Sequence, residues 1–255
     1  NERRVLVTGG CGLIGGELCS QLVKEGAWVF VADPLPPGTL GSHHLVSNMQ
    51  IDATGEASHD GDSNVILWRG DASTALFRYK PVGFFDALFH LAAVSHVEQS
   101  RSNPIRTFDT NSKLTWDVLE AARHAGVKAV LVPSSNHVYG PHNGALTAED
   151  APMRQLDIYS ASKACQDIVA RAYAHNYGLP VVVARNTNCF GPYDPHTDHI
   201  VPSTILSVMN GKRPVLRTDG TTKKAYLYVG DVADSFIQLA RWQIEHPDQQ
   251  GEVFN

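Results

Sequence analysis

The 255-residue sequence contains no long apolar run, no long run of basic residues and no recognisable leader segment. A membrane-spanning helix needs roughly 18 or more apolar residues, and no stretch approaches that length. The N-terminus leads directly into a short apolar run, so we expect no signal peptide and no membrane partner. With a formal net charge of −5, the composition also argues against nucleic acid as a partner.

Cysteine is scarce as well. The four cysteines, Cys11, Cys19, Cys165 and Cys189, form no CxxC pair and no cysteine–histidine cluster with the spacing of a zinc site. Scattered cysteines of this kind are typical of reduced thiols in a cytoplasmic protein, which is the location we predict. On the same grounds we expect no metal site.

What the sequence does contain is a regular alternation of short apolar segments with helical ones. Hydrophobic residues make up 43% of the chain, enough to bury the core of one large α/β domain. The apolar segments are almost continuous, which is typical of parallel strands covered on both faces. We therefore predict an α/β fold, a Rossmann-like doubly wound parallel sheet with a small C-terminal substrate lobe. The predicted strands cover 5–7, 28–32, 65–68, 85–90, 129–132 and 181–184, and the clearest helices cover 107–125 and 159–177.

A glycine-rich turn follows the first predicted strand and opens a helix. Gly10-x-Gly12-x-x-Gly15 has the spacing that lets a backbone approach a pyrophosphate at a helix N-terminus. Asp33 ends the second strand, 18 residues after Gly15, where a carboxylate binds a ribose 2′-hydroxyl and repels a 2′-phosphate. No Arg or Lys occurs between Asp33 and Arg69, so we predict NAD rather than NADP. Asp71 either bonds the adenine amino group or caps the next helix.

Three segments are predicted along the chain. Residues 1–191 form the NAD-binding Rossmann domain. Residues 192–225 are rich in Pro, Gly, Thr and His, with one short helix at 204–209, and form part of a substrate-binding lobe. Residues 226–255 return to the Rossmann domain through a helix at 231–242. A further strand begins at the end of the chain, so we expect the lobe to be truncated here.

Tyr159 and Lys163 are four residues apart on a predicted helix and therefore share one face. A nearby ammonium lowers the pKa of a phenol, which makes tyrosine a usable general acid or base near neutral pH. Ser135 follows the strand at 129–132 and is placed to donate a hydrogen bond to the same substrate oxygen.

Several further motifs accompany these residues in a fixed order. Together they resemble the NAD-dependent epimerase/dehydratase family, the extended short-chain dehydrogenases, over essentially the whole chain. Residues 200–220 are also similar to the sugar-nucleotide lobe of CDP-glucose 4,6-dehydratase-like proteins. The motifs are Thr8-Gly9-Gly10-x-Gly12-x-x-Gly15, His90-Leu91-Ala92-Ala93, Asn111, Ser134-Ser135-x-x-Val138-Tyr139-Gly140, Tyr159-x-x-x-Lys163, Arg185-x-x-Asn188-x-x-Gly191-Pro192 and Tyr228-Val229-x-Asp231.

The resemblance implies a role for each matching residue. Tyr159 is the catalytic base, Lys163 lowers its pKa and holds the nicotinamide ribose, and Ser135 polarises the sugar hydroxyl. The implied partners are a nucleotide-sugar substrate and a second copy of the chain, paired through the helices at 107–125 and 159–177. The implied cofactor-binding residues are Gly9, Gly12, Leu13, Ile14, Gly15, Asp33, Asp71, Ala92, Asn111, Tyr159 and Lys163. Asn188 is the implied contact of the substrate diphosphate. The family's arginine is missing at the diphosphate, so either Arg217, Lys223 and Lys224 share its role or the substrate lacks a diphosphate.

Two departures from the family pattern bear on the reaction. Asn136 and His137 stand where the dehydratases place an acidic residue followed by Glu or Lys. Asn cannot titrate, whereas His137 is either an acid–base residue or a packing residue. Lys224-Ala225 replaces the usual Arg-Asp, and lysine gives no bidentate clamp on a diphosphate. We therefore predict a nucleotide-sugar epimerase that oxidises C4 transiently. The alternatives are a 4,6-dehydratase, a uronate or sugar dehydrogenase, and a non-catalytic NAD-binding scaffold.

Overall fold

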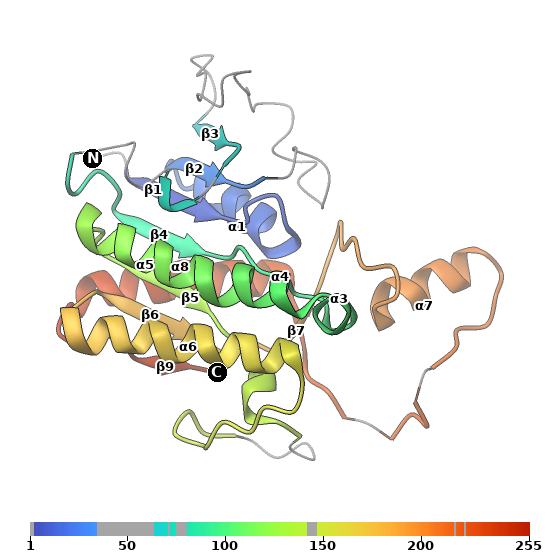
Figure 1. The fold of residues 1–255 in the computed structure, drawn as a ribbon. Coiled ribbons are helices and arrows are strands. Elements are labelled where there is room, and N and C mark those ends of the chain that lie inside the picture. The colour runs from blue at the N-terminus through green and yellow to red at the C-terminus, as the bar shows by residue number, and fades with distance from the viewer. Residues whose placement is uncertain are drawn as a thin grey trace.

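The computed structural model describes residues 3–34, 64–70, 72–74, 81–141, 147–216, 218–221 and 223–255. Within them the chain forms a seven-stranded sheet in the order β3-β2-β1-β4-β5-β6-β9, and every neighbouring pair is parallel (Figure 1). This confirms the predicted doubly wound α/β fold. The strands are β1 (Arg4–Thr8), β2 (Trp28–Ala32), β3 (Val65–Trp68), β4 (Ala87–His90), β5 (Val130–Pro133), β6 (Val181–Ala184) and β9 (Val253–Phe254).

The strand order reverses between β1 and β4. From β1 the chain continues to β2 and β3 on one side, and from β4 to β5 and β6 on the other. In open α/β sheets, ligands bind beyond the carboxyl ends of the strands at such a reversal. The loops that follow β1 and β4 therefore lie at the expected binding edge.

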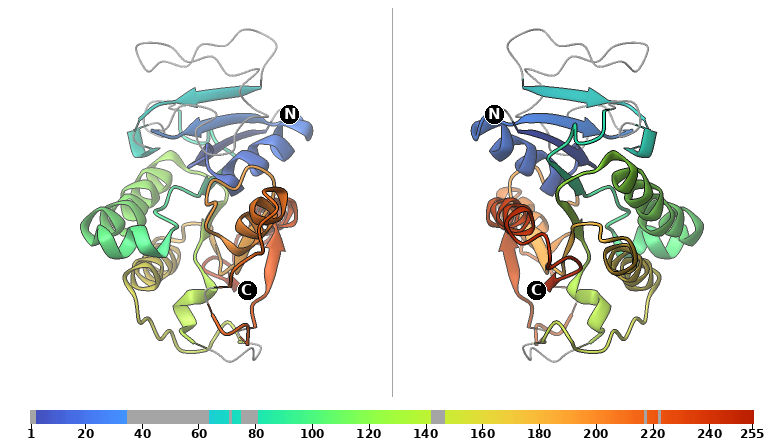
Figure 2. Two further views of the ribbon diagram at one scale, coloured as in Figure 1. Left: turned by 90° about the vertical axis from the view of Figure 1, so that its right-hand side faces the viewer. Right: turned by 90° about the vertical axis from the view of Figure 1, so that its left-hand side faces the viewer.

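Helices cover both faces of the sheet (Figures 1 and 2). α1 (Leu13–Lys24) and α8 (Val229–Glu245) pack on one face, where Leu18 of α1 and Phe236 of α8 join one buried core. α5 (Leu114–Ala125) and α6 (Ile158–Tyr177) pack on the other, where a second core forms. Each fully buried Leu or Phe contributes about 1.5–3 kcal/mol by leaving water. Because strands such as β5 send side chains into both cores, all four of its residues are buried.

The predicted helix at 107–125 begins earlier and is not uniform. It comprises α4 (Pro104–Phe108), a π-helical segment η2 (Asp109–Lys113) and α5. Asn103 caps α4 by accepting a hydrogen bond from the backbone N of Arg106 at 3.2 Å, and Pro104 occupies the first turn, where no N–H is needed. The π turn widens the backbone at Asn111, next to α6, and such turns occur often at functional sites.

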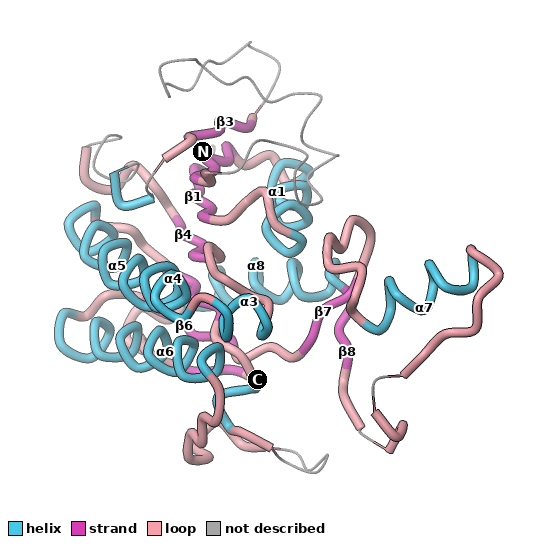
Figure 3. The backbone as a smooth tube through the Cα atoms, turned by 45° about the vertical axis from the view of Figure 1, so that its right-hand side comes forward, coloured by secondary structure: helices cyan, strands magenta, loops and turns pink. Residues whose placement is uncertain are grey.

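The C-terminal part differs from the predicted arrangement in one respect. β7 (Asn188–Phe190) pairs with β8 (Tyr226–Tyr228) in a separate two-stranded sheet, so residue 226 begins a strand outside the main sheet, and the chain returns to the core only with α8 (Figure 3). α7 (Ile200–Met209) is longer than the predicted helix at 204–209 and buries no residue. β9 pairs with β6, which confirms the predicted final strand. Among the described residues, no helix is long and apolar enough to cross a membrane.

Candidate active site

The glycine-rich turn joins β1 to α1 at the binding edge of the sheet. Gly9 has a φ of +70°, and a Cβ there would lie 2.7 Å from the backbone N of Ala92, on the loop after β4. A Cβ on Gly15 would lie 2.2 Å from the carbonyl oxygen of Gly9. At Gly12, in contrast, the only atom near a Cβ would be that same oxygen, at 3.3 Å. The turn is therefore packed tightly on its inner side and open at Gly12.

α1 begins after Gly12 without a side-chain cap and without an acidic residue in its first turn. The first backbone N–H groups of a helix have no partner within the helix, and they favour an anion. Leu13 and Ile14 form this first turn, half-buried, as the cofactor prediction requires. Ala92 lies against Gly9 and donates its N–H to Thr8 Oγ1 at 3.1 Å, which fastens the loop after β4 to the end of β1.

Asp33 follows β2 and is 4% exposed. Its Oδ2 accepts a hydrogen bond from the backbone N of Cys11 at 2.9 Å, which fixes the carboxylate beside the glycine turn. Burial and this carboxylate raise the pKa of the Cys11 thiol to about 12. Cys11 therefore stays a neutral thiol. Asp71, the other predicted adenosine contact, lies outside the described residues.

Ser135, His137 and Tyr159 converge beyond the carboxyl end of β5. Ser135 Oγ accepts a hydrogen bond from the backbone N of His137 at 3.2 Å, which caps the 3₁₀ turn η3 (Asn136–Tyr139). The rings of His137 and Tyr159 meet edge to face, with centroids 5.8 Å apart. Burial raises the pKa of Tyr159 to about 12, while a hydrogen bond with Ser135 acts in the opposite direction. The structure thus brings together the three residues predicted around the reacting sugar carbon.

Lys163 lies on the buried side of α6. Its Nζ donates to the carbonyl oxygen of Pro133 at 2.5 Å and to the amide oxygen of Gln166. Burial lowers the pKa of Lys163 to about 7. Lys163 is not among the main groups that shift the pKa of Tyr159, so the predicted effect of the ammonium on the phenol is not seen in this side-chain arrangement.

A buried hydrogen-bond chain connects Lys163 to the glycine turn. From Gln166, the amide Nε2 donates to Thr115 Oγ1 at 3.0 Å. Thr115 Oγ1 lies 3.0 Å from His90 Nε2, and His90 Nδ1 lies 2.9 Å from Thr8 Oγ1. Every residue of this chain is at most 4% exposed, namely Lys163, Gln166, Thr115, His90 and Thr8. The sequence motifs contain His90 and Lys163, but nothing in them pointed to Gln166.

The directions of these bonds determine the protonation of His90. Thr115 donates its hydroxyl proton to the carbonyl oxygen of Asn111 at 2.8 Å, so His90 Nε2 must be the donor to Thr115. Thr8 Oγ1 accepts from Ala92 N and uses its own proton toward His90 Nδ1. His90 therefore carries a proton on Nε2.

Asn111 is fully buried in the π turn. Its side chain accepts from the backbone N of Val94 at 2.7 Å and donates to the Val94 carbonyl oxygen at 3.0 Å and to Ser162 Oγ at 2.9 Å. These bonds fasten the loop after β4 to α6, beside Tyr159 and Lys163. The Asn111 side chain therefore holds the loop after β4 against α6, and its polar atoms are used in these contacts.

Of the predicted substrate contacts Asn188, Arg217 and Lys224, the structure describes Asn188 and Lys224. Asn188 opens β7, where it pairs with Tyr226 of β8, and Lys224 is exposed just before β8. The two therefore lie near one another at the small sheet. Arg217 lies outside the described residues.

Sequence reasoning did not single out the amide oxygens beside Ser135. Asn136 Oδ1 and Asn186 Oδ1 are buried and have no hydrogen-bond partner in the described part of the chain. Asn136 also donates its Nδ2 to Thr187 Oγ1 at 3.3 Å, which fixes the side chain. A buried acceptor without a partner is costly, and a polar ligand group removes that cost.

Comparison with known proteins decides the family. The family model described as "NAD dependent epimerase/dehydratase family" matches residues 5–255. The chain belongs to this family.

Relatives of the chain include dehydratases and epimerases. A dTDP-glucose 4,6-dehydratase of Mycobacterium tuberculosis (strain CDC 1551 / Oshkosh) is 31% identical over 89% of this chain, which spans 66% of that relative. A UDP-glucose 4-epimerase of Mycolicibacterium smegmatis is 30% identical over 99% of this chain and 76% of its own length. Among solved structures, the dTDP-glucose 4,6-dehydratase DesIV from Streptomyces venezuelae, with NAD bound, has a TM-score of 0.79 at 30% identity; the match covers 98% of this chain and 74% of that one. The chain thus spans about two thirds of the first relative's length.

The described residues fit the NAD that gives this family its name. Gly9 and Gly15 leave no room for a side chain inside the turn, Gly12 leaves its outer face open, and Asp33 holds a carboxylate beside the turn that would bind the ribose of a bound NAD. A 2′-phosphate would meet that negative charge, which favours NAD over NADP as predicted.

Proposed function

We propose that the protein is an NAD-dependent enzyme that modifies a nucleotide-linked sugar by oxidation at C4. The observation that carries this proposal is the convergence of Tyr159, Ser135 and His137 at the edge of the sheet where the glycine turn also lies. When bound, NAD accepts the hydride that leaves the sugar carbon.

Tyr159 is the residue that removes the proton of the sugar hydroxyl. Ser135 donates a hydrogen bond to the same oxygen and steadies it while charge develops. With a pKa of about 12, Tyr159 is protonated near neutrality in the arrangement described, so its activation needs a positive charge nearby. Lys163, the nearest lysine on the same helix face, supplies that charge when its ammonium turns toward the phenol.

The fate of the oxidised sugar depends on what surrounds C5 and C6. The relatives include both dehydratases and epimerases, so the comparisons favour neither dehydration nor epimerisation. Asn136 cannot move a proton, and its free Oδ1 is suited to accept a hydrogen bond from a sugar hydroxyl. His137 belongs to η3, and its ring lies edge to face with that of Tyr159, so it is placed to remove or return a second proton. A dehydratase therefore requires His137 for chemistry, whereas an epimerase does not.

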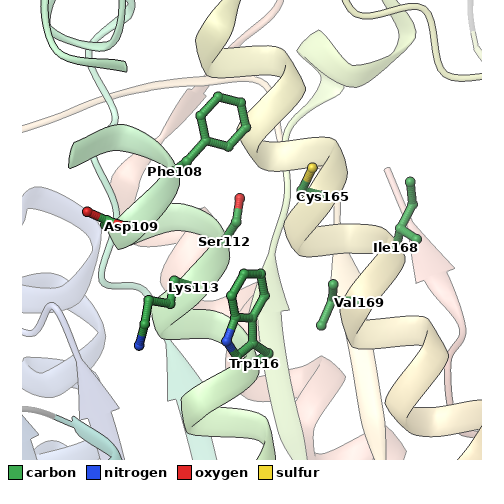
Figure 4. Close-up of a pocket in the computed structure, with 8 residues that line it drawn as sticks. All are labelled: Phe108, Asp109, Ser112, Lys113, Trp116, Cys165, Ile168 and Val169. Carbon is green, nitrogen blue, oxygen red and sulfur yellow. The ribbon is translucent and has the colours of Figure 1, made fainter. Parts of the chain in front are cut away.

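The remaining partners are proposals on the same basis. Asn188, Arg217 and Lys224 bind the diphosphate of the substrate, and the location is cytoplasmic. A second copy of the chain is expected at the groove between α4–α5 and α6, which has a volume of about 420 Å³ (Figure 4). Phe108 and Trp116 line this groove on one side, and Ile168 lines it from α6. Trp116 is 42% exposed and Ile168 is 53% exposed, so pairing of two copies would bury apolar surface.

The test is to incubate the full-length protein with NAD and a panel of nucleotide sugars, and to analyse the products by chromatography coupled to mass spectrometry. A new product of unchanged mass identifies an epimerase, and loss of one water identifies a dehydratase. Stoichiometric formation of NADH from a free uronic acid or sugar would instead identify a dehydrogenase. No change with any nucleotide sugar would contradict the proposal.

A further inference from the structure

Three histidines and one aspartate gather where the segment after β4 meets the loop after β7. His96 begins α3 (Val97–Ser102) after β4, whereas His196, Asp198 and His199 belong to the loop between β7 and α7. One side-chain nitrogen or oxygen of each residue lies within 4.8 Å of those of the other three. The imidazole rings of His96 and His196 stack with centroids 5.0 Å apart, and those of His196 and His199 lie 4.8 Å apart.

The cluster borders a cavity of about 300 Å³ that includes Gln99 and Ser102 of α3. His96 Nε2 and Asp198 Oδ2 are 3.1 Å apart, but His96 Nδ1 is buried and has no hydrogen-bond partner among the described residues. Burial of an imidazole nitrogen without a partner costs free energy, which a bound ligand removes.

A second carboxylate lies behind the cluster. Asp194 Oδ2 is 3.2 Å from His199 Nδ1, and its Oδ1 accepts from the backbone N of His196 at 3.0 Å. The side chain of Asp194 is only 2% exposed. A carboxylate that binds one ring nitrogen of a histidine orients the other nitrogen toward a metal and increases its basicity. Asp194 thus holds the His199 ring in place without being a metal ligand itself.

We propose that His96, His196, His199 and Asp198 bind one Zn²⁺ ion, which fastens the loop after β7 to the start of α3. Three imidazole nitrogens and one carboxylate oxygen are ligands that zinc prefers, and four protein ligands complete a tetrahedral structural site. Tetrahedral ligands at about 2.0–2.2 Å from zinc are about 3.3–3.6 Å apart, so the observed spacing needs a closure of roughly 1 Å. Rotation of half-exposed side chains such as Asp198, 41% exposed, provides that closure.

The sequence did not predict this site because its ligands are separated. His96 precedes His196 by 100 positions, and His196-x-Asp198-His199 has no cysteine and no familiar zinc spacing. Because β4 and β6 are parallel strands of one sheet, the segments that follow them, including the loop after β7, leave from the same edge.

The experiment measures metal binding directly. The protein is stripped with a chelator, dialysed, reloaded with Zn²⁺, and analysed for bound metal by mass spectrometry. Reloading with Co²⁺ adds a spectroscopic test, since tetrahedral cobalt has strong visible absorption. We expect one metal ion per chain, tetrahedral Co²⁺ absorption, and a rise in Tm of about 5–10 °C at a 100-fold excess of metal over Kd.

The variants His196→Gln and His199→Gln should lose the bound metal and the rise in Tm. His175→Gln, an exposed histidine on α6, is the matched control and should retain both. Circular dichroism checks that each variant is folded. If a variant does not fold, the cobalt spectrum and stoichiometry of the unmodified protein decide the matter alone. No bound metal in that protein, or equal binding in the cluster variants and the control, would overturn the proposal and leave the cluster as a hydrogen-bonded contact between two loops.

Discussion

The amide oxygen of Gln166 accepts a hydrogen bond from Nζ of Lys163, one turn earlier on α6. The other end of the same amide leads through Thr115 and His90 to Thr8, at the start of the glycine turn. Gln166 therefore links the lysine of the reaction site to the loop that holds the cofactor.

Replacement of Gln166 by Leu should destabilise the protonated form of Lys163, because the ammonium loses a hydrogen-bond acceptor. A hydrogen bond to a charged group contributes about 1.5–3 kcal/mol, so the already lowered pKa of Lys163 should fall by a further unit or two. Because turnover needs the ammonium, the basic limb of the pH profile of kcat should move to lower pH by a similar amount. Gln243→Leu, on α8 and equally buried, is the control. An unchanged profile in Gln166→Leu would show that the contact is only structural.

Lys163 also makes stability depend on pH. Its folded pKa of about 7 lies below the ordinary value of 10.5, so between these two pH values the unfolded chain binds more protons than the native one. The cost of burying the charge is complete below pH 7 and disappears as the pH rises toward 10.5. Stability from this group therefore rises with pH, by up to about 1.4 kcal/mol per pH unit.

Urea denaturation of the wild type and of Lys163→Met at pH 7, 8 and 9 measures this effect. The free energy of unfolding of the wild type should increase relative to that of Lys163→Met over the series. A constant difference between the two proteins would mean that Lys163 keeps its charge in the native state throughout this range.

Replacement of Tyr159 by Phe removes the phenol oxygen and little else. Turnover should fall by about 10²–10⁴-fold, the usual contribution of a general acid or base. NAD should still bind, because the glycine turn and Asp33 are untouched, and fluorescence titration measures that affinity. Normal turnover by Tyr159→Phe would exclude the proposed mechanism.

The two ends of the glycine turn should respond differently to a methyl group. In Gly15→Ala the new Cβ would collide with the carbonyl oxygen of Gly9, so we expect a loss of about 1–3 kcal/mol in stability or more. In Gly12→Ala the Cβ faces the open side, so Tm should change little while NAD affinity falls tenfold or more. Thermal denaturation and NAD titration separate the two effects. Unchanged NAD affinity in Gly12→Ala would place the pyrophosphate elsewhere.

A buried ion pair holds α6 to the end of β6. Arg185 Nε donates to Asp167 Oδ2 at 2.8 Å and its second nitrogen donates to Oδ1 at 3.1 Å, and the two side chains are 2% and 0% exposed. Asp167→Ala leaves Arg185 charged and without its carboxylate, so the free energy of unfolding should fall by about 3–5 kcal/mol. Asp234→Ala, on the exposed side of α8, should change it by less than about 0.5 kcal/mol. Denaturant titration compares them, and equal losses would contradict this account.

Much of the fold follows from local sequence. The apolar runs at β1, β2, β3, β5 and β6 and the glycines that end α5 and α6 report backbone preferences that hold wherever the segment lies. The glycine turn, Asp33, Ser135 and the Tyr159–Lys163 spacing are local signals too, and they indicated the family. The π turn at Asn111, the pairing of β8 with β7 and the direction of the Lys163 side chain were not predicted. Each depends on contacts with other segments, as the direction of Lys163 depends on the carbonyl oxygen of Pro133 at the end of β5. Likewise His96 and His199 lie close together because the chain leaves β4 and β6 at the same edge of one parallel sheet, a relationship that no spacing along the chain records.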